Sequence, residues 1–331
     1  MLPGMSQATR LVRSGKLMQA VAVIRQALGG KSAPVHDLAP GATRVVEPIA
    51  RPTPAAPGQF ESHTYSNQAG TRDYKLYVPP GSADRPMPLV VMLHGCTQSA
   101  DDFAAGTRMN ELAAEFGFLV AYPEQASSAN PNKCWNWFKR TEQDRDQGEP
   151  SIIAGIVGAV KGAHAIDERR IFVAGLSSGG AMAATLAAIY PELFAAVGVH
   201  SGLPHGSAHD LPSAFAAMRG GSRGSAVPPI RGIVFHGDRD STVHPRNGEE
   251  IFDQWRSGRA EAMIHVDTSG EANGYGYTRR IFQDEVGRPH LEHWVVHGGA
   301  HTWFGGSPAG THTDAGGPDA SREMVRFFLG V

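Results

Sequence analysis

A serine, an aspartate and a histidine follow one another in this chain in a pattern that suits nucleophilic hydrolysis of an acyl bond. Ser177 is the centre of Gly175-Leu176-Ser177-Ser178-Gly179, a G-x-S-x-G motif in which a sharp turn between a strand and a helix exposes the serine hydroxyl. A serine hydroxyl is a weak nucleophile at neutral pH, so it needs a histidine base and an acid that holds the histidine tautomer. Asp240 and His301 follow in that order. The pattern predicts a nucleophile at Ser177, an acid at Asp240 and a base at His301.

A second G-x-S-x-G match, centred on Ser222, shows how little the motif means without its context. Glycine accounts for 40 of the 331 residues, so chance matches are expected. No β-branched run precedes Ser222 and no helix-forming run follows it, whereas Ser177 has an apolar run before it and an alanine-rich run after it. The context predicts that Ser222 is a loop serine.

The acid and the base each have a neighbour of the same type. Asp238 and Asp240 both follow one short apolar run, and His297 and His301 both follow another. Asp240 lies further into its loop than Asp238. His301 lies in a glycine-rich loop that can carry it across to the serine, which favours it over His297.

Alternating strand and helix patterns surround these residues and must position them. Such alternation predicts an α/β fold with a mostly parallel central sheet flanked by helices. The first two strands are expected to form a hairpin, a second hairpin is expected around Gly287, and residues 201–229 are expected to form a Gly/Ser/Pro-rich insertion. The predicted strands lie near 61–65, 72–78, 88–93, 118–122, 170–176, 195–199, 231–235 and 291–296, and the predicted helices near 107–116, 151–164, 181–188, 246–255 and 319–329.

The first part of the chain is expected to be an appendage to this catalytic domain, which we place at residues 59–331. Within residues 1–30, Leu17, Val21, Ile24 and Leu28 recur at helical spacing, which favours an amphipathic helix over a secretory signal peptide. Its apolar side could dock on the catalytic domain or on a second subunit. Residues 31–58 are rich in Pro, Ala and Gly and are expected to be a linker.

Composition excludes several classes of function. The net charge of −2 shows no electrostatic footprint for nucleic acid or an anionic membrane, and we expect a neutral substrate. No apolar run reaches the roughly 20 residues that span a bilayer. His200, His205 and His209 lack the spacing and the neighbouring ligands of a metal site, and they are expected to be loop residues. Neither a metal nor a cofactor is expected.

Residues 60–331 resemble the polyhydroxybutyrate depolymerase-like esterases of the α/β-hydrolase superfamily, which are related to feruloyl and acetylxylan esterases. In that family the acid is the fifth residue of an H-G-x-x-D-x-x-V pattern, which implies Asp240 rather than Asp238. The resemblance also implies an extracellular enzyme, although without a signal peptide a protein that starts as given would be cytoplasmic. The motifs that carry the resemblance are His94-Gly95-Cys96-Thr97-Gln98, Tyr122-Pro123-Glu124-Gln125, Cys134-Trp135-Asn136-Trp137-Phe138, Gly175-Leu176-Ser177-Ser178-Gly179-Gly180 and Gly299-Ala300-His301-Thr302-Trp303.

Further residues of these motifs are expected at the active site. Acyl transfer needs hydrogen-bond donors for the developing oxyanion, usually the backbone N–H after the nucleophile and another from the loop after the third strand. We therefore expect the backbone amides of Ser178 and Cys96 to be these donors. Trp135, Trp137 and Trp303 are expected either to line an apolar acyl slot or to pack within the core or the loops.

The chain has two cysteines, Cys96 and Cys134, and both lie in the family's motifs. A disulfide between them would tie the oxyanion loop to the Trp-rich loop. The alternative is a pair of buried free thiols.

The activity predicted is that of a serine carboxylesterase that hydrolyses short-chain or hydroxyalkanoate esters through an acyl-enzyme. A carbohydrate esterase that removes feruloyl or acetyl groups is the first alternative, and an attached carbohydrate-binding module, which would favour it, is not visible. The second alternative is a catalytically silent hydrolase fold that serves as a binding protein. An intact Ser177, Asp240 and His301 argue against it.

Overall fold

The computed structural model describes residues 58–81, 85–257, 259 and 263–331. The chain divides into two units between Thr53 and Pro54, and every described residue belongs to the second unit, Pro54–Val331. The predicted N-terminal helix within residues 1–30, and the predicted linker up to residue 57, therefore lie outside the described residues.

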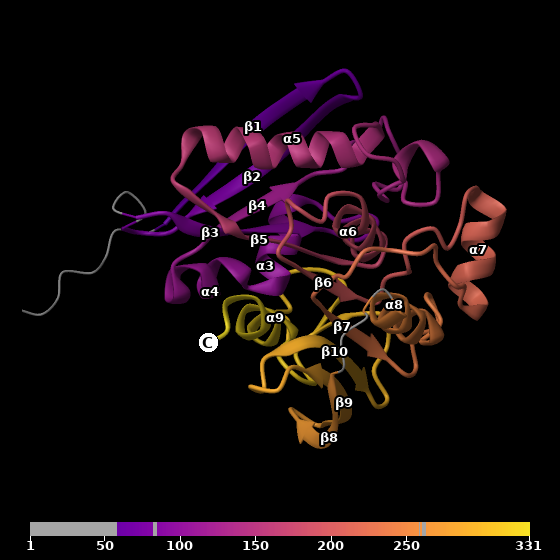
Figure 1. The fold of residues 1–331 in the computed structure, drawn as a ribbon. Helices are drawn as coiled ribbons and strands as arrows, with labels where there is room; N and C mark the ends of the chain where they lie inside the picture. The colour runs from indigo at the N-terminus through magenta and orange to yellow at the C-terminus, as the bar shows by residue number, and fades with distance from the viewer. Residues whose placement is uncertain (1–57, 82–84, 258, 260–262) are drawn as a thin grey trace, which may run out of the picture. The chain divides into compact units, whose positions relative to one another are not determined.

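The second unit is built on a ten-stranded sheet with the order β1-β2-β4-β3-β5-β6-β7-β10-β9-β8, which runs from top to bottom in Figure 1. Neighbouring strands from β4 to β10 in this order pair in parallel, whereas β1, β2, β9 and β8 add antiparallel edges. The predicted α/β fold with a mostly parallel sheet is confirmed. The strands are β1 (Gln59–Asn67), β2 (Gly70–Val78), β3 (Met87–Leu93), β4 (Leu119–Pro123), β5 (Ile166–Leu176), β6 (Ala196–His200), β7 (Gly232–Gly237), β8 (Ile264–Ala272), β9 (Tyr275–Gln283) and β10 (Pro289–Val296).

Helices cover both faces of the sheet, and strand β3 contributes side chains to the hydrophobic core on each face. Leu89 and Val91 pack with residues of α5, α6 and α8, whereas Val90 and Met92 pack with residues of α3, α4 and α9. Successive side chains of a strand point to opposite faces, so a strand buried on both sides is a continuous apolar run. The helices are α3 (Ala100–Thr107), α4 (Met109–Phe116), α5 (Gly148–Ala163), α6 (Ser178–Ile189), α7 (Leu211–Gly220), α8 (Arg246–Ser257) and α9 (Ala320–Leu329), with a short 3-10 helix at Arg140–Glu142.

Some elements were not predicted from the sequence: β8, α3, α7, the 3-10 helix and the short paired strands β11 (Trp303–Phe304) and β12 (Thr313–Asp314). Strand β8 is exposed along most of its length and therefore lacks the apolar run that would identify it. Asn273 and Gly274, both at positive φ, join β8 to β9, and an Asn-Gly turn is a strong hairpin signal. Helix α3 immediately precedes α4, and α7 lies inside the predicted insertion 201–229. Among the residues that the structure describes, no helix has the length and apolar composition to cross a bilayer.

Candidate active site

Ser177 lies on a sharp turn between β5 and α6. Its backbone has φ 56° and ψ −118°, a strained conformation for a residue with a Cβ. A Cβ at Gly175 would lie 2.4 Å from the Gly179 carbonyl, and one at Gly179 would lie 2.1 Å from the Leu93 carbonyl oxygen. Both positions therefore require glycine, because the turn packs against the end of β3. The turn leaves Ser177 partly exposed at the carboxyl edge of the sheet.

Asp240 and His301 lie in the loops that follow β7 and β10. His301 Nδ1 is 2.7 Å from Asp240 Oδ2. The side chain of Asp240 is fully buried and that of His301 is 14% exposed. Strands β5, β7 and β10 run parallel, with β6 between β5 and β7. The loops that carry Ser177, Asp240 and His301 therefore leave the same edge of the sheet.

The Asp240 carboxylate has a full set of hydrogen-bond donors. Oδ1 accepts bonds from the backbone amides of Thr242 (2.9 Å) and Val243 (2.8 Å), and Oδ2 also lies 3.3 Å from His236 Nε2. Burial alone would raise the pKa of Asp240, but the hydrogen bonds and charges of His236 and His301 outweigh it and lower the pKa below its usual value. Asp240 is therefore ionised at neutral pH. An anionic carboxylate favours the His301 tautomer with its proton on Nδ1, which leaves Nε2 free to act as a base.

Asp238 and His297 form a separate pair, with Nδ1 of His297 3.1 Å from Asp238 Oδ2. Their side chains are 38% and 47% exposed, and His297 Nε2 also contacts the Thr278 hydroxyl at 2.9 Å. Both nitrogens of the His297 ring are thus engaged at the surface. Of the two alternatives for acid and base, the structure buries the pair Asp240 and His301.

The prediction that His200 is a loop residue is wrong, because His200 is the last residue of β6. Its carbonyl accepts the Ser177 amide at 2.9 Å, and its Nε2 accepts the Phe304 amide at 3.2 Å. Its ring stacks on Trp303 at 5.0 Å. Burial lowers the pKa of His200 well below its usual value, so the ring is neutral. His200 thereby links the serine turn, through its backbone carbonyl, to the segment that follows His301, through its uncharged ring.

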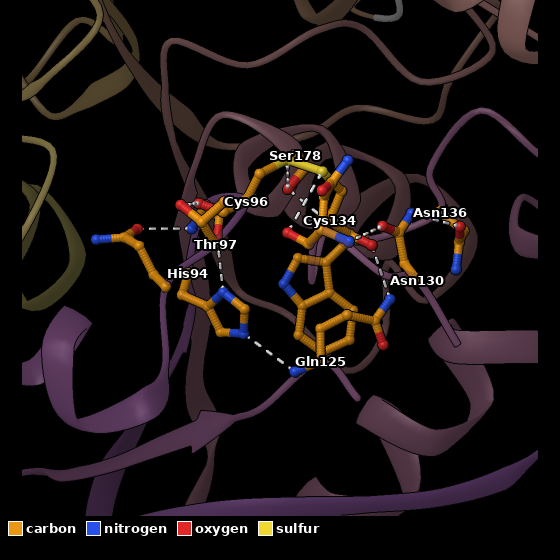
Figure 2. Close-up of a disulfide and its surroundings, with 12 residues drawn as sticks. His94, Cys96, Thr97, Gln125, Asn130, Cys134, Asn136 and Ser178 are labelled. Atoms are coloured by element: carbon orange, nitrogen blue, oxygen red, sulfur yellow. Dashed lines mark hydrogen bonds between the residues drawn. A yellow bond between two sulfur atoms is a disulfide. The ribbon is translucent and has the colours of Figure 1, made fainter. Parts of the chain in front are cut away.

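The backbone amides of Ser178 and Cys96 are available as oxyanion donors. In the part of the chain that the structure describes, neither amide N–H donates a hydrogen bond to another group. The carbonyl of the Gly95–Cys96 peptide accepts a bond from His94 Nδ1 at 2.7 Å, and the Gln125 amide donates to His94 Nε2 at 3.0 Å (Figure 2). C=O and N–H point in opposite directions in a trans peptide, so this bond fixes the direction of the Cys96 N–H.

Cys96 and Cys134 form a disulfide with an S–S distance of 2.07 Å (Figure 2). Of the two alternatives left open by the sequence, the structure has the bridge. The Cys134 loop is held in turn by the buried carboxylate of Glu149, which accepts bonds from the backbone and the side chain of Asn136 at 2.8 and 2.6 Å. The disulfide thereby attaches the loop that contains the Cys96 amide to a rigid part of the core.

Of the two alternatives for the tryptophans, the lining of an acyl slot and packing within the core, the structure shows packing within the core. Trp135 and Trp303 have no exposed surface, and Trp137 is 6% exposed. Trp135 and Trp137 pack in the core on the α6 side of the sheet, and Trp303 packs on the opposite side, where its indole N–H donates to Ser321. Burying such large apolar rings contributes more free energy than leaving them in a loop at the surface.

Ser222 is the centre of the second G-x-S-x-G match. Ser222 follows α7, and its hydroxyl donates to the Ser207 carbonyl at 3.0 Å, so it is a loop serine. No group of three or more His, Cys, Asp or Glu side chains within the described ranges could hold a metal ion.

The chain is similar to known esterases. A family model described as "Esterase PHB depolymerase" matches residues 72–280. Poly(3-hydroxyalkanoate) depolymerase C of Paucimonas lemoignei is 34% identical over 268 residues, which are 76% of this chain but only 62% of that protein. Acetylxylan esterase A of Emericella nidulans is 30% identical over 224 residues, covering 60% of this chain and 71% of that one. An acetyl xylan esterase structure from Aspergillus awamori has the same fold, with a TM-score of 0.63 and 21% identity over 82% of this chain and 100% of that one.

Proposed function

Because this chain belongs to the esterase PHB depolymerase family, we propose that it is a serine carboxylesterase with Ser177 as nucleophile, His301 as base and Asp240 as the orienting acid. The observation that carries the proposal is the buried contact of 2.7 Å between His301 and Asp240, in loops that leave the same sheet edge as the Ser177 turn. This arrangement supplies the nucleophile, base and acid that acyl transfer needs.

In the proposed reaction, His301 Nε2 removes the hydroxyl proton of Ser177 as Oγ attacks the ester carbonyl carbon. The amides of Cys96 and Ser178 donate to the oxyanion of the tetrahedral intermediate. The intermediate collapses, the C–O bond to the alcohol breaks, and His301 gives the proton to the leaving alcohol. Water then attacks the acyl-enzyme with the same base, which releases the acid and restores Ser177. No cofactor takes part in these steps.

We propose neutral esters with short or 3-hydroxy acyl groups as substrates. The names of the relatives support this class, since one is a poly(3-hydroxyalkanoate) depolymerase and another an acetylxylan esterase. Relatives named feruloyl esterase B keep the carbohydrate-esterase alternative open. The buried tryptophans give no support to a particular acyl length, so the proposed preference for short acyl groups is supported by the names of the relatives alone.

The test is a panel of esters with the purified protein. It compares p-nitrophenyl acetate, butyrate, hexanoate and decanoate with 3-hydroxybutyrate oligomers, methyl ferulate and acetylated xylan. We expect cleavage of the short esters and the oligomers, and a strong preference for methyl ferulate or for decanoate would overturn the substrate class. A fluorophosphonate probe should label Ser177, and the absence of an adduct would favour the silent binding protein.

We also propose that the protein works in an oxidising, extracellular compartment. The disulfide between Cys96 and Cys134 supports this location, because such bonds persist outside the reducing cytosol. Fractionation of cells that express the gene should find the protein in the medium with both cysteines oxidised. Protein confined to the cytosol with free thiols would contradict the proposal.

A further inference from the structure

The loop that contains the proposed oxyanion donor is held by a set of side-chain hydrogen bonds as well as by the disulfide. Gln98 is buried, its Oε1 accepts the Gly95 amide at 2.9 Å, and its Nε2 donates to Asp102 Oδ2 at 2.8 Å. Gly95 precedes Cys96, whose amide is one of the proposed donors. The side chain of Gln98 therefore connects the oxyanion loop to Asp102 in the first turn of α3.

Asp102 also binds a segment that lies far away in the chain. Its Oδ1 accepts the Thr311 amide at 2.8 Å, its Oδ2 accepts the Thr311 hydroxyl at 2.7 Å, and Gln98 Nε2 donates to the Thr311 carbonyl at 3.0 Å. One carboxylate thus joins residues that are 209 positions apart in the chain. We call Gln98, Asp102 and Thr311 the loop clamp.

The backbone around the loop clamp is closely packed, which limits its movement. A Cβ at Gly310 would lie 2.5 Å from the Asp102 carbonyl oxygen and 2.5 Å from Gly106 Cα, so the segment that contains Thr311 lies directly on α3. The same segment pairs back onto the chain after the base, because the Trp303 amide donates to the His312 carbonyl at 2.8 Å. Trp303 follows His301 by only two positions. The loop clamp therefore lies between the oxyanion loop and the base loop.

We propose that Asp102 is a positioning residue for the oxyanion donor, acting through Gln98 on the Gly95 N–H, one peptide before the Cys96 N–H, and through Thr311 on the loop that follows His301. This inference rests on the proposed function. The oxyanion forms only during the reaction, so a displaced donor raises the transition-state barrier and leaves ground-state binding of the ester unchanged. Removal of one such donor costs a hundredfold to a thousandfold in kcat, so we expect displacement to cost about tenfold to a hundredfold.

The test is Asp102→Asn with Asp101→Asn as its matched control. Asp101 is the neighbouring residue on the same helix, it is 61% exposed, and its contact is Lys75 rather than the loop clamp. In Asp102→Asn, an amide nitrogen replaces one carboxylate oxygen, so it opposes either the Gln98 Nε2 donor at the Oδ2 position or the Thr311 N–H at the Oδ1 position. We expect kcat for p-nitrophenyl butyrate to fall about tenfold to a hundredfold with KM within twofold of the wild type, and Asp101→Asn to be unchanged.

A second measurement separates positioning from a structural role. Butyl trifluoromethyl ketone adds to the serine hydroxyl and forms a tetrahedral oxyanion, so its inhibition constant should rise by the same factor as kcat/KM falls. If Asp102→Asn does not fold, Thr311→Val serves in its place, and Thr311→Ser should restore the rate because it keeps the hydroxyl. A raised KM with unchanged kcat, or a lower melting temperature with wild-type kinetics and inhibition, would overturn the proposal. A wild-type protein without esterase activity or probe labelling would instead overturn the proposed function.

Discussion

Asp240→Asn is the substitution that most directly tests the proposed triad. The amide of asparagine cannot rotate freely at this site, because the amides of Thr242 and Val243 both donate to the Oδ1 position and require an oxygen there. The amide nitrogen must then occupy the Oδ2 position, 2.7 Å from His301 Nδ1. An N–H group at that place forces Nδ1 to accept and moves the ring proton to Nε2, where it blocks proton removal from Ser177.

The magnitude follows from this forced tautomer. The equivalent change in the serine protease template lowers kcat by about ten-thousandfold, which corresponds to about 5 kcal/mol in the activation free energy. His236 Nε2 lies 3.3 Å from Oδ2 and 2.9 Å from the Val243 carbonyl, so the new amide nitrogen also opposes this donor. We expect a lower free energy of unfolding as well, by about 1 to 3 kcal/mol.

The assay compares kcat/KM on p-nitrophenyl butyrate with the urea unfolding midpoint for Asp240→Asn and Asp238→Asn. Asp238 is the matched control because it also contacts a histidine, but at the surface. Its variant should keep both activity and stability close to the wild type. The assignment would be falsified if Asp240→Asn kept more than about a tenth of the activity, or if Asp238→Asn were the inactive variant.

Three further outcomes are expected. Ser177→Ala should lose several orders of magnitude in esterase rate, whereas Ser222→Ala, whose hydroxyl contacts only loop carbonyls, should stay near the wild type, and equal rates would refute the choice of nucleophile. Denatured, unreduced protein should titrate no thiol, and reduction should lower the free energy of unfolding by about 4 kcal/mol because Cys96 and Cys134 close a loop of 38 residues; two titratable thiols would rule the bridge out. Burial lowers the pKa of His293 to about 3, so its contribution to stability is complete above the unfolded pKa of about 6.5 and is lost as the pH falls toward 3. Between pH 7.5 and pH 5 the free energy of unfolding of the wild type should therefore fall by about 2 kcal/mol more than that of His293→Met. Equal decreases, measured by urea unfolding at the two pH values, would contradict a buried neutral His293.

The sequence by itself determined the elements with strong local signals. Buried parallel strands such as β3 are continuous apolar runs, and Gly175 and Gly179 on either side of Ser177 occupy positions that tolerate no Cβ. The sequence also shows the order of Ser177, Asp240 and His301, and its local context predicts that Ser222 is a loop serine. These features depend on residues that are close neighbours in sequence, so pattern and spacing suffice.

Weak local signals account for the errors along the chain. Strand β8 is stabilised by pairing with β9 while most of its side chains face solvent, so its apolar pattern is faint. His200 looks like the start of a loop, yet its ring is buried by Trp303, which lies about a hundred residues later. The direction of Trp135 and Trp303 depends on which side of the sheet has room for an indole, and the spacing of loop residues does not encode this.

Only the tertiary structure showed which of two neighbouring residues of the same type is buried, and which residues far apart in the sequence are in contact. Asp238 and Asp240 differ by two positions, and the path of the backbone after β7 buries one carboxylate and exposes the other. Likewise, the loop clamp joins Asp102 to Thr311 because α3 and the segment near Gly310 approach within backbone contact. Such contacts form only when the strands and helices assemble, because they depend on the packing of the whole sheet. No periodic pattern in the sequence predicts them.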